Sequence, residues 1–184
     1  YVWTTLESGA DVAFVDVPGH EKFLGNMLAG VGPAPVVLFV VAADEGWQAQ
    51  SADHRDALRA LGIRHGIVAL TRADRADQHR RAEVTAQVRA ELAGTALADA
   101  PLVTVSAKSG EGVDKLRASL DAVLAGLPAP DSTARVRLWV DRAFSVKGAG
   151  TVVTGTLAAG TIAVGDELTI GERKAVVRGL QSEN

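Results

Sequence analysis

The feature that most constrains the fold of this chain is an uninterrupted apolar run, "VVLFVVAA" at residues 36–43. A strand that faces solvent on one side alternates apolar and polar residues, whereas a strand covered by helices on both faces is apolar throughout. Two shorter runs of the same kind follow, "GIVAL" at 66–70 and "LVTVS" at 102–106. We therefore expect these segments to be strands of a buried parallel sheet.

Three helical patterns accompany these strands. The first is predicted to begin with Ser51 as its N-cap and to end at Gly62, and the second to begin with Asp77 and end near Gly94. The third is predicted to be closed by Pro128. Their apolar stripes contain His54, Leu58 and Leu61, then Val84, Val88 and Leu92, then Val113, Leu116, Leu120, Val123, Leu124 and Leu127. Strands that alternate with helices predict a doubly wound α/β sheet over residues 1–127.

The two ends of the chain have a different pattern. Near the start, "VWTTL" and "VAFVDV" flank the turn signal "ESGAD" and predict an antiparallel hairpin. A Pro-rich linker is expected at 128–133, within "LPAPDSTA". Residues 134–184 contain short β-rich runs punctuated by glycine and no helical period, which predicts the start of an antiparallel β-barrel.

Composition narrows the possible functions. The 184 residues include no cysteine, which excludes a disulfide framework and a thiolate metal site. A net charge of −3 does not predict a broad nucleic-acid-coating surface. The longest apolar run is far shorter than the roughly 20 residues of a membrane span, so no membrane partner is expected.

Polar residues of a specific kind follow three of the predicted strands. Each loop is expected at the carboxyl end of a parallel strand, the edge where open α/β sheets bind ligands. In "DVPG", Asp16 can contact Mg²⁺ through a water, and the N–H of Gly19 can approach a phosphate without obstruction by a Cβ atom.

The other two loops are "TRAD" at 71–74 and "SAK" at 106–108. The carboxylate of Asp74 can accept two hydrogen bonds from a guanine edge, while the stem of Arg72 packs on a ring face. Backbone N–H groups of the second loop can bind the guanine carbonyl. The candidate base-binding residues are Thr71, Arg72, Asp74, Ser106, Ala107 and Lys108. The alternative is that Asp16, Asp74 and Ser106 only cap helices or close turns.

In this order, the loops resemble those of the translational GTPases. The segment "DVPGHEKFLGNMLAG" resembles their second switch, "TRAD" and "SAKSGEGVDKL" their guanine-reading motifs, and "DRAFSVKGAGTVVTGTLAAGTIAVGDEL" the opening of their β-barrel domain. Within the family, the chain is most similar to selenocysteine-specific elongation factors, on "TRAD", "WTTLESGADVAFVDVPGH" and "VDRAFSVKG". Elongation factor Tu and initiation factor 2 gamma are the alternatives.

The resemblance implies roles for individual residues. His20 would position the water that attacks GTP in line, Asp16 would hold the Mg²⁺ shell, and Gly19 would sense the γ-phosphate. Asp74 would select guanine over adenine in GTP and GDP. Asp141 and Arg142 would line the pocket for the charged amino acid, because an arginine suits a selenolate anion; a strand-end ion pair is the alternative for these two.

The resemblance also implies partners and a missing part. The partners would be selenocysteyl-tRNA, the ribosome and, through domains outside this chain, an mRNA hairpin, all in the cytoplasm. The phosphate loop, GxxxxGK followed by Ser or Thr, does not occur in these residues. We therefore expect a fragment that begins after the first switch: its parent would be a GTPase, but these residues alone would be inactive. A nucleotide-free binding module is the competing hypothesis.

Overall fold

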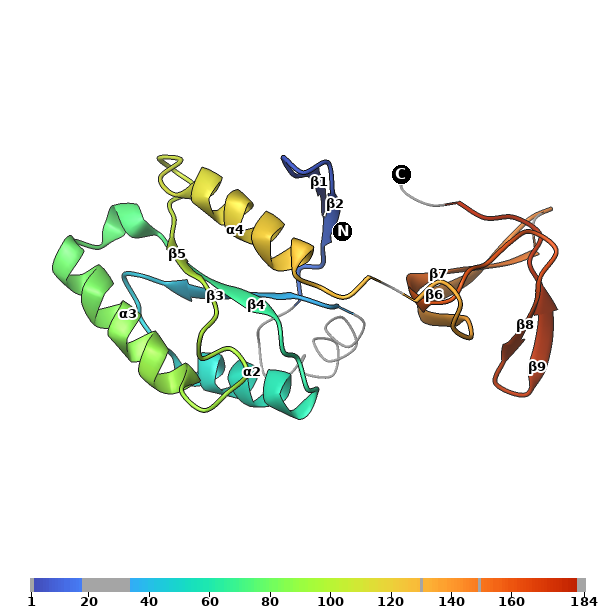
Figure 1. Cartoon of the computed structure of the whole chain (residues 1–184), viewed down its shortest axis with the longest axis horizontal. Coiled ribbons are helices and arrows are strands. Elements are labelled where there is room, and N and C mark those ends of the chain that lie inside the picture. The colour runs from blue at the N-terminus through green and yellow to red at the C-terminus, as the bar shows by residue number, and fades with distance from the viewer. Residues whose placement is uncertain (1, 18–33, 130, 149, 182–184) are drawn as a thin grey trace. The chain divides into compact units, whose positions relative to one another are not determined.

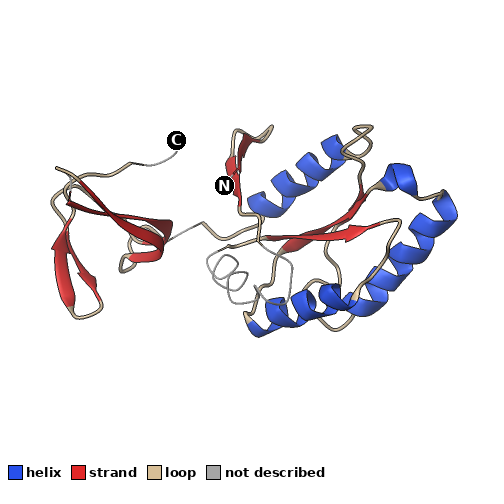
Figure 2. Cartoon of the chain, turned by 180° about the vertical axis from the view of Figure 1, so that it is seen from behind, coloured by secondary structure: helices blue, strands red, loops and turns tan. Residues whose placement is uncertain are grey.

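The computed structural model describes residues 2–17, 34–129, 131–148 and 150–181. The chain forms two compact units, Tyr1–Leu127 and Pro128–Asn184 (Figure 1). The first contains helices and strands, and the described part of the second contains strands without helices (Figure 2). The elements of the first unit are β1 (Val2–Thr5), β2 (Asp11–Phe14), β3 (Val37–Ala42), α2 (Ala49–Ala60), β4 (Gly66–Thr71), a 3-10 helix (Ala73–Arg75), α3 (Gln78–Leu92), β5 (Leu102–Thr104) and α4 (Val113–Ala125).

The centre of the first unit is a parallel sheet with the strand order β3-β4-β5. Val37 of β3 pairs with Gly66 of β4, and Val68 of β4 pairs with Leu102 of β5. The predicted parallel sheet is therefore confirmed. Residues 66–70 of β4 are all buried, as expected for a central strand with both faces covered.

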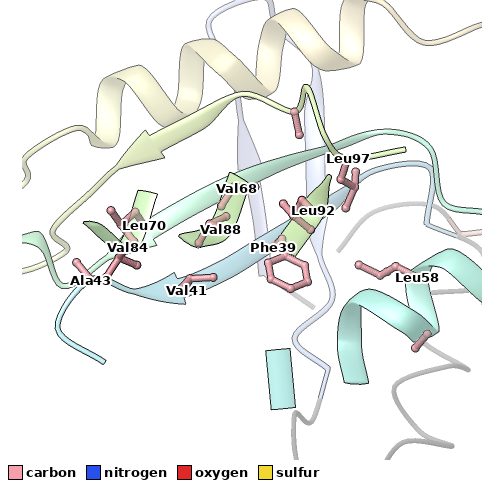
Figure 3. Packing of buried hydrophobic residues seen from close by; sticks show 12 residues of the cluster. Phe39, Val41, Ala43, Leu58, Val68, Leu70, Val84, Val88, Leu92 and Leu97 are labelled. Atoms are coloured by element: carbon pink, nitrogen blue, oxygen red, sulfur yellow. The ribbon is translucent and has the colours of Figure 1, made fainter. Parts of the chain in front are cut away.

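One face of this sheet packs on α2 and α3. Successive side chains of a strand point to opposite faces, so Val68 and Leu70 of β4 share this side. Val84, Val88 and Leu92 of α3 are fully buried against them, as their helical spacing predicted. Figure 3 shows the side chains of Phe39, Val41, Leu58, Val68, Leu70, Val84, Val88 and Leu92 in this cluster.

The opposite face packs on α4 and on the hairpin formed by β1 and β2. Ile67 and Ala69 of β4 point to this side, where they join Leu120 of α4 in a second buried cluster. Because helices cover both faces of the parallel sheet, the predicted doubly wound α/β fold is confirmed.

The hairpin is antiparallel, as predicted, with Val2 opposite Phe14. It is fastened to α4: the Arg117 guanidinium donates to the Thr5 carbonyl at 2.6 Å, and Ser8 Oγ donates to Asp121 Oδ1 at 2.5 Å. Among the described strands, β2 pairs with β1 alone. The expectation that Asp16 follows a parallel strand is therefore wrong for the described sheet.

Some of the predicted helix ends are confirmed and others are wrong. Asp77 is the N-cap of α3 and accepts the N–H of Arg80, and Gly62, with φ +69°, follows the end of α2. Ser51 is not an N-cap: α2 begins earlier, after Gln48, and Ser51 Oγ instead accepts the Gln48 N–H. Similarly, α4 ends at Ala125, before Leu127. No helix in the described ranges has both the length and the apolar character needed to cross a membrane.

The second unit consists of antiparallel strand pairs, β6 (Arg137–Val146) with β7 (Gly150–Ala159) and β8 (Glu167–Ile170) with β9 (Arg173–Val176). The predicted antiparallel, β-rich character of this region is confirmed. The longer pair contains an irregularity, since Val140 pairs with Gly155 and Arg142 with Thr154, which leaves Asp141 as the extra residue of a bulge. Gly155 fits there because a Cβ atom would lie 2.0 Å from the Trp139 carbonyl oxygen.

Candidate functional site

The carboxyl ends of β4 and β5 bring the loops "TRAD" and "SAK" together. The Val105 N–H donates to the Leu70 carbonyl at 2.8 Å and extends the pairing of the two strands beyond β5. The Ala73 N–H then donates to the Val105 carbonyl at 3.1 Å. Thr71, the last residue of β4, donates its hydroxyl to the Val41 carbonyl at 3.3 Å. The parallel sheet thus places both loops at the edge where ligands bind in such folds.

Asp74 and Ser106 meet directly at this edge. Ser106 Oγ donates to Asp74 Oδ1 at 2.6 Å. Ser106 is completely buried, whereas Asp74 is exposed. The hydrogen bond from Ser106 lowers the pKa of the Asp74 carboxyl below its ordinary value, with smaller contributions from Lys108 and Arg75. Asp74 is therefore an ionised, oriented acceptor that is open to a ligand.

The second loop is a tight turn closed around Ser106. Its N–H donates to the Glu111 carbonyl at 2.9 Å, and its carbonyl accepts the Gly110 N–H at 2.9 Å. Ala107 and Lys108 are exposed at the tip, and their N–H groups donate to none of the described residues. These two N–H groups are suitable donors for a ligand carbonyl.

Arg72 points to a different neighbour. Its backbone adopts the left-handed conformation with φ 53°, and its guanidinium forms ion pairs with Glu45 at 2.6 Å and Asp44 at 3.2 Å. The hydrogen bonds that it donates to the Glu45 and Asp44 carboxylates raise its pKa further above the ordinary range. Arg72 thus ties the "TRAD" loop to the loop that follows β3.

The remaining predicted site residues are Asp16, Gly19, His20, Asp141 and Arg142. Asp16 is exposed, two residues beyond the end of β2, while Gly19 and His20 lie outside the described residues. In the second unit, Asp141 accepts a hydrogen bond from the hydroxyl of Thr154, the residue that pairs with Arg142. The guanidinium of Arg142 is exposed and contacts no charged or hydrogen-bonding partner among the described residues.

Two residues that sequence reasoning did not single out also belong to the site. Arg81 of α3 forms an ion pair with Glu111 at 2.7 Å, and it donates to the Ala73 carbonyl at 2.6 Å. Arg81 lies on the polar face of its helix among other charged residues, so no local pattern distinguishes it. Glu111 stands in the "SAKSGEG" segment, and its position next to Gly112 is the only available signal.

A doubly wound sheet with an oriented aspartate, a buried serine and open N–H groups at adjacent strand ends is the arrangement of an α/β nucleotide-binding domain. The profile of the Elongation factor Tu GTP binding domain matches residues 2–126. The chain belongs to this family.

Individual relatives agree with the family assignment. The selenocysteine-specific elongation factor of Escherichia coli (strain K12) is 44% identical, and the match covers 100% of this chain and 30% of that protein. A translation initiation factor 2 subunit gamma from Haloquadratum walsbyi is 33% identical, over 98% of this chain and 48% of the relative. A crystal structure of a bacterial selenocysteine-specific elongation factor superposes with a TM-score of 0.87 at 30% identity, covering 96% of this chain and 31% of that one. The chain thus spans about a third of the selenocysteine-specific factors.

Proposed function

We propose that this chain is part of a translational GTPase that delivers selenocysteyl-tRNA to the ribosome. The observation that carries the GTP-binding part of this proposal is the hydrogen bond between Ser106 and Asp74, which joins the two loops at the carboxyl ends of β4 and β5. The similarity to selenocysteine-specific elongation factors favours this member of the family. Delivery of another aminoacyl-tRNA, as by elongation factor Tu or initiation factor 2 gamma, is the alternative.

In this proposal the site reads the guanine base of GTP and GDP. Asp74, held ionised by Ser106, accepts hydrogen bonds from the N1–H and the 2-amino group. The N–H groups of Ala107 and Lys108 bind the guanine carbonyl. Adenine presents the opposite donor and acceptor pattern at these positions, so it leaves the Asp74 carboxylate without donors. Thr71 and Arg72 hold the shape of the pocket, because their side chains fix the loop to β3 and to Asp44 and Glu45.

The phosphate side of the site is assigned to Asp16, Gly19 and His20. Asp16 is a single exposed carboxylate, and no cluster of three metal-binding side chains occurs among the described residues. A single carboxylate fits Mg²⁺, which keeps several waters and binds mainly to nucleotide phosphates. We assign the γ-phosphate contact to Gly19 and the positioning of the attacking water to His20, with electrostatic stabilisation of an in-line displacement.

The second unit contributes the aminoacyl pocket. The bulge at Asp141 interrupts the regular strand pairing beside Arg142, and bulges next to binding sites redirect side chains. The Thr154 hydroxyl holds the Asp141 carboxylate, and the neighbouring Arg142 guanidinium is exposed for an anion. A selenolate is ionised at neutral pH, whereas a serine hydroxyl is neutral, so Arg142 favours selenocysteyl-tRNA.

In this proposal each compact unit has its own function, nucleotide binding in the first and the aminoacyl pocket in the second. Residues 1–127 form part of the GTP-binding domain, 128–133 the linker and 134–184 part of the β-barrel domain. The ribosome is the partner on which hydrolysis occurs, and an mRNA hairpin is bound by domains outside this chain. The protein acts in the cytoplasm, where translation takes place.

The proposal is tested by changing the base that the full-length protein prefers. In Asp74→Asn, the amide presents a donor where the carboxylate accepted, which matches the C2 carbonyl of xanthine in place of the 2-amino group of guanine. We expect binding to shift from GTP toward xanthosine triphosphate. Asp77→Asn is the matched control, because asparagine also caps a helix and the hydrogen bonds that Asp77 forms within the described ranges go to α3. An unchanged preference for GTP in Asp74→Asn would contradict the assignment of Asp74 as the guanine-reading residue.

A further inference from the structure

A single guanidinium reaches both loops of the proposed base site. Arg81 Nε lies 3.1 Å from the Ala73 carbonyl oxygen and 3.0 Å from that of Ala76, and Nη2 lies 2.6 Å from the Ala73 oxygen. On its other side, Nη1 lies 2.7 Å from Glu111 Oε1 and Nη2 lies 3.3 Å from Oε2. The planar fork of an arginine can serve all of these acceptors at once, and a lysine cannot.

Glu111 links Arg81 to Ser106 through two hydrogen-bonding groups. Its carboxylate binds Arg81, and its backbone carbonyl accepts the Ser106 N–H at 2.9 Å. The next residue, Gly112, lies close against the backbone of β5, since a Cβ atom there would be 2.0 Å from the Thr104 carbonyl oxygen. The path Ala73–Arg81–Glu111–Ser106 therefore closes a ring around the hydrogen bond between Asp74 and Ser106.

Burial increases the free-energy cost of breaking the hydrogen bonds of this ring. Ala73 is completely buried, and its carbonyl oxygen accepts both donors from Arg81. Without the guanidinium, this buried carbonyl would keep only the Ala76 N–H, at 3.2 Å, as a donor among the described residues. The loss of hydrogen bonds at a buried position costs more than the loss of an exposed contact. The 3-10 turn that carries Asp74 would then relax, and the Asp74 carboxylate would move relative to Ser106.

We infer that Arg81, together with Glu111, is a positioning residue that sets the selectivity of Asp74 for the guanine 2-amino group. This inference rests on the proposed function. Arg81 does not touch the base; it acts through Ala73 and Glu111. Its removal reduces discrimination at the 2-amino group more than it reduces nucleotide binding in general.

The test compares the affinities of the full-length protein for GDP and for inosine diphosphate, which lacks only the 2-amino group. The ratio of the two affinities reports on Asp74, and a general loss of stability leaves that ratio unchanged. We expect Arg81→Ala to reduce the ratio at least about fivefold, a fraction of the worth of a charged hydrogen bond, and Arg81→Lys to retain part of it. Glu111→Gln should lower it in the same direction and serves as a second variant should Arg81→Ala not fold.

Arg89→Ala is the matched control. Arg89 lies on the same helix and also donates to two backbone carbonyls, those of Ala98 and Ala100, but it reaches neither base loop. Its ratio should stay within about twofold of the wild type. If both Arg81→Ala and Glu111→Gln keep the wild-type affinity ratio, or if Arg89→Ala lowers the ratio as much as Arg81→Ala does, the positioning role of Arg81 is contradicted. The proposed function is not affected by either result. A wild-type protein that binds GDP and inosine diphosphate equally overturns the proposed function and this inference with it.

Discussion

Ser106 Oγ lies 2.6 Å from Asp74 Oδ1, although 32 positions of the chain separate the two residues. The serine is completely buried and the aspartate is exposed, so the hydrogen bond orients a surface carboxylate from below. This bond is the main reason why the pKa of Asp74 lies below its ordinary value.

Replacing Ser106 by alanine should make the stability of the protein depend differently on pH. Because the pKa of Asp74 is lower in the folded state than in the unfolded chain, its ionised form contributes stability above the ordinary aspartate pKa of 3.8. That contribution is lost as the pH falls through the folded-state pKa. The difference in unfolding free energy between wild type and Ser106→Ala should therefore be larger at about pH 6 than at about pH 3, measured by urea titration. Ser109→Ala, at an exposed position of the same loop, should show no such change.

Arg142→Ala in the full-length protein should weaken binding of selenocysteyl-tRNA far more than binding of seryl-tRNA. An exposed guanidinium beside the bulge interacts with a selenolate by charge, and alanine removes that interaction without removing a partner within the described chain. A loss of about tenfold for selenocysteyl-tRNA corresponds to one charge-assisted contact. Filter binding with both tRNAs measures it, and Arg137→Ala on the same strand is the control. Equal losses for both tRNAs would argue against the assignment.

Gly112→Ala should destabilise the first unit much more than Gly110→Ala. Both glycines have positive φ, +73° and +80°, so both substitutions carry the cost of left-handed backbone, about 1–2 kcal/mol. Only at Gly112 does the added Cβ meet backbone, at 2.0 Å from the Thr104 carbonyl oxygen, whereas nothing lies within 4 Å at Gly110. Urea unfolding should separate the two variants by a further ~2 kcal/mol or more. Equal stabilities would show that the loop shifts without cost.

Leu92→Ala should destabilise the protein by about 2–5 kcal/mol, because a fully buried leucine leaves a cavity between α3 and the sheet. Leu61→Ala, just beyond the end of α2, removes the same atoms from an exposed position and should cost well under half as much. Denaturant midpoints at constant m-value give both numbers. A cost for Leu61→Ala as large as that for Leu92→Ala would contradict the description of the core.

Much of the fold was predictable because it depends on local patterns. The run at 36–43 became β3, and Asp77 caps α3 as its position before an apolar stripe indicated. The contact of the "TRAD" and "SAK" loops was also predictable, because parallel strands bring their carboxyl ends to one edge. The prediction that Ser51 is an N-cap is wrong because α2 begins after Gln48, which is not a typical capping residue.

The chain by itself therefore determined which segments form strands and helices and which polar loops meet, since apolar periodicity and strand direction are properties of the sequence. Only the tertiary structure decided where the long polar side chains point. Arg72 lies against Asp44 and Glu45, and Arg81 against Glu111, across separations of about thirty positions. An arginine on a polar helix face has many possible partners, and the packing of α3 on the sheet selects among them.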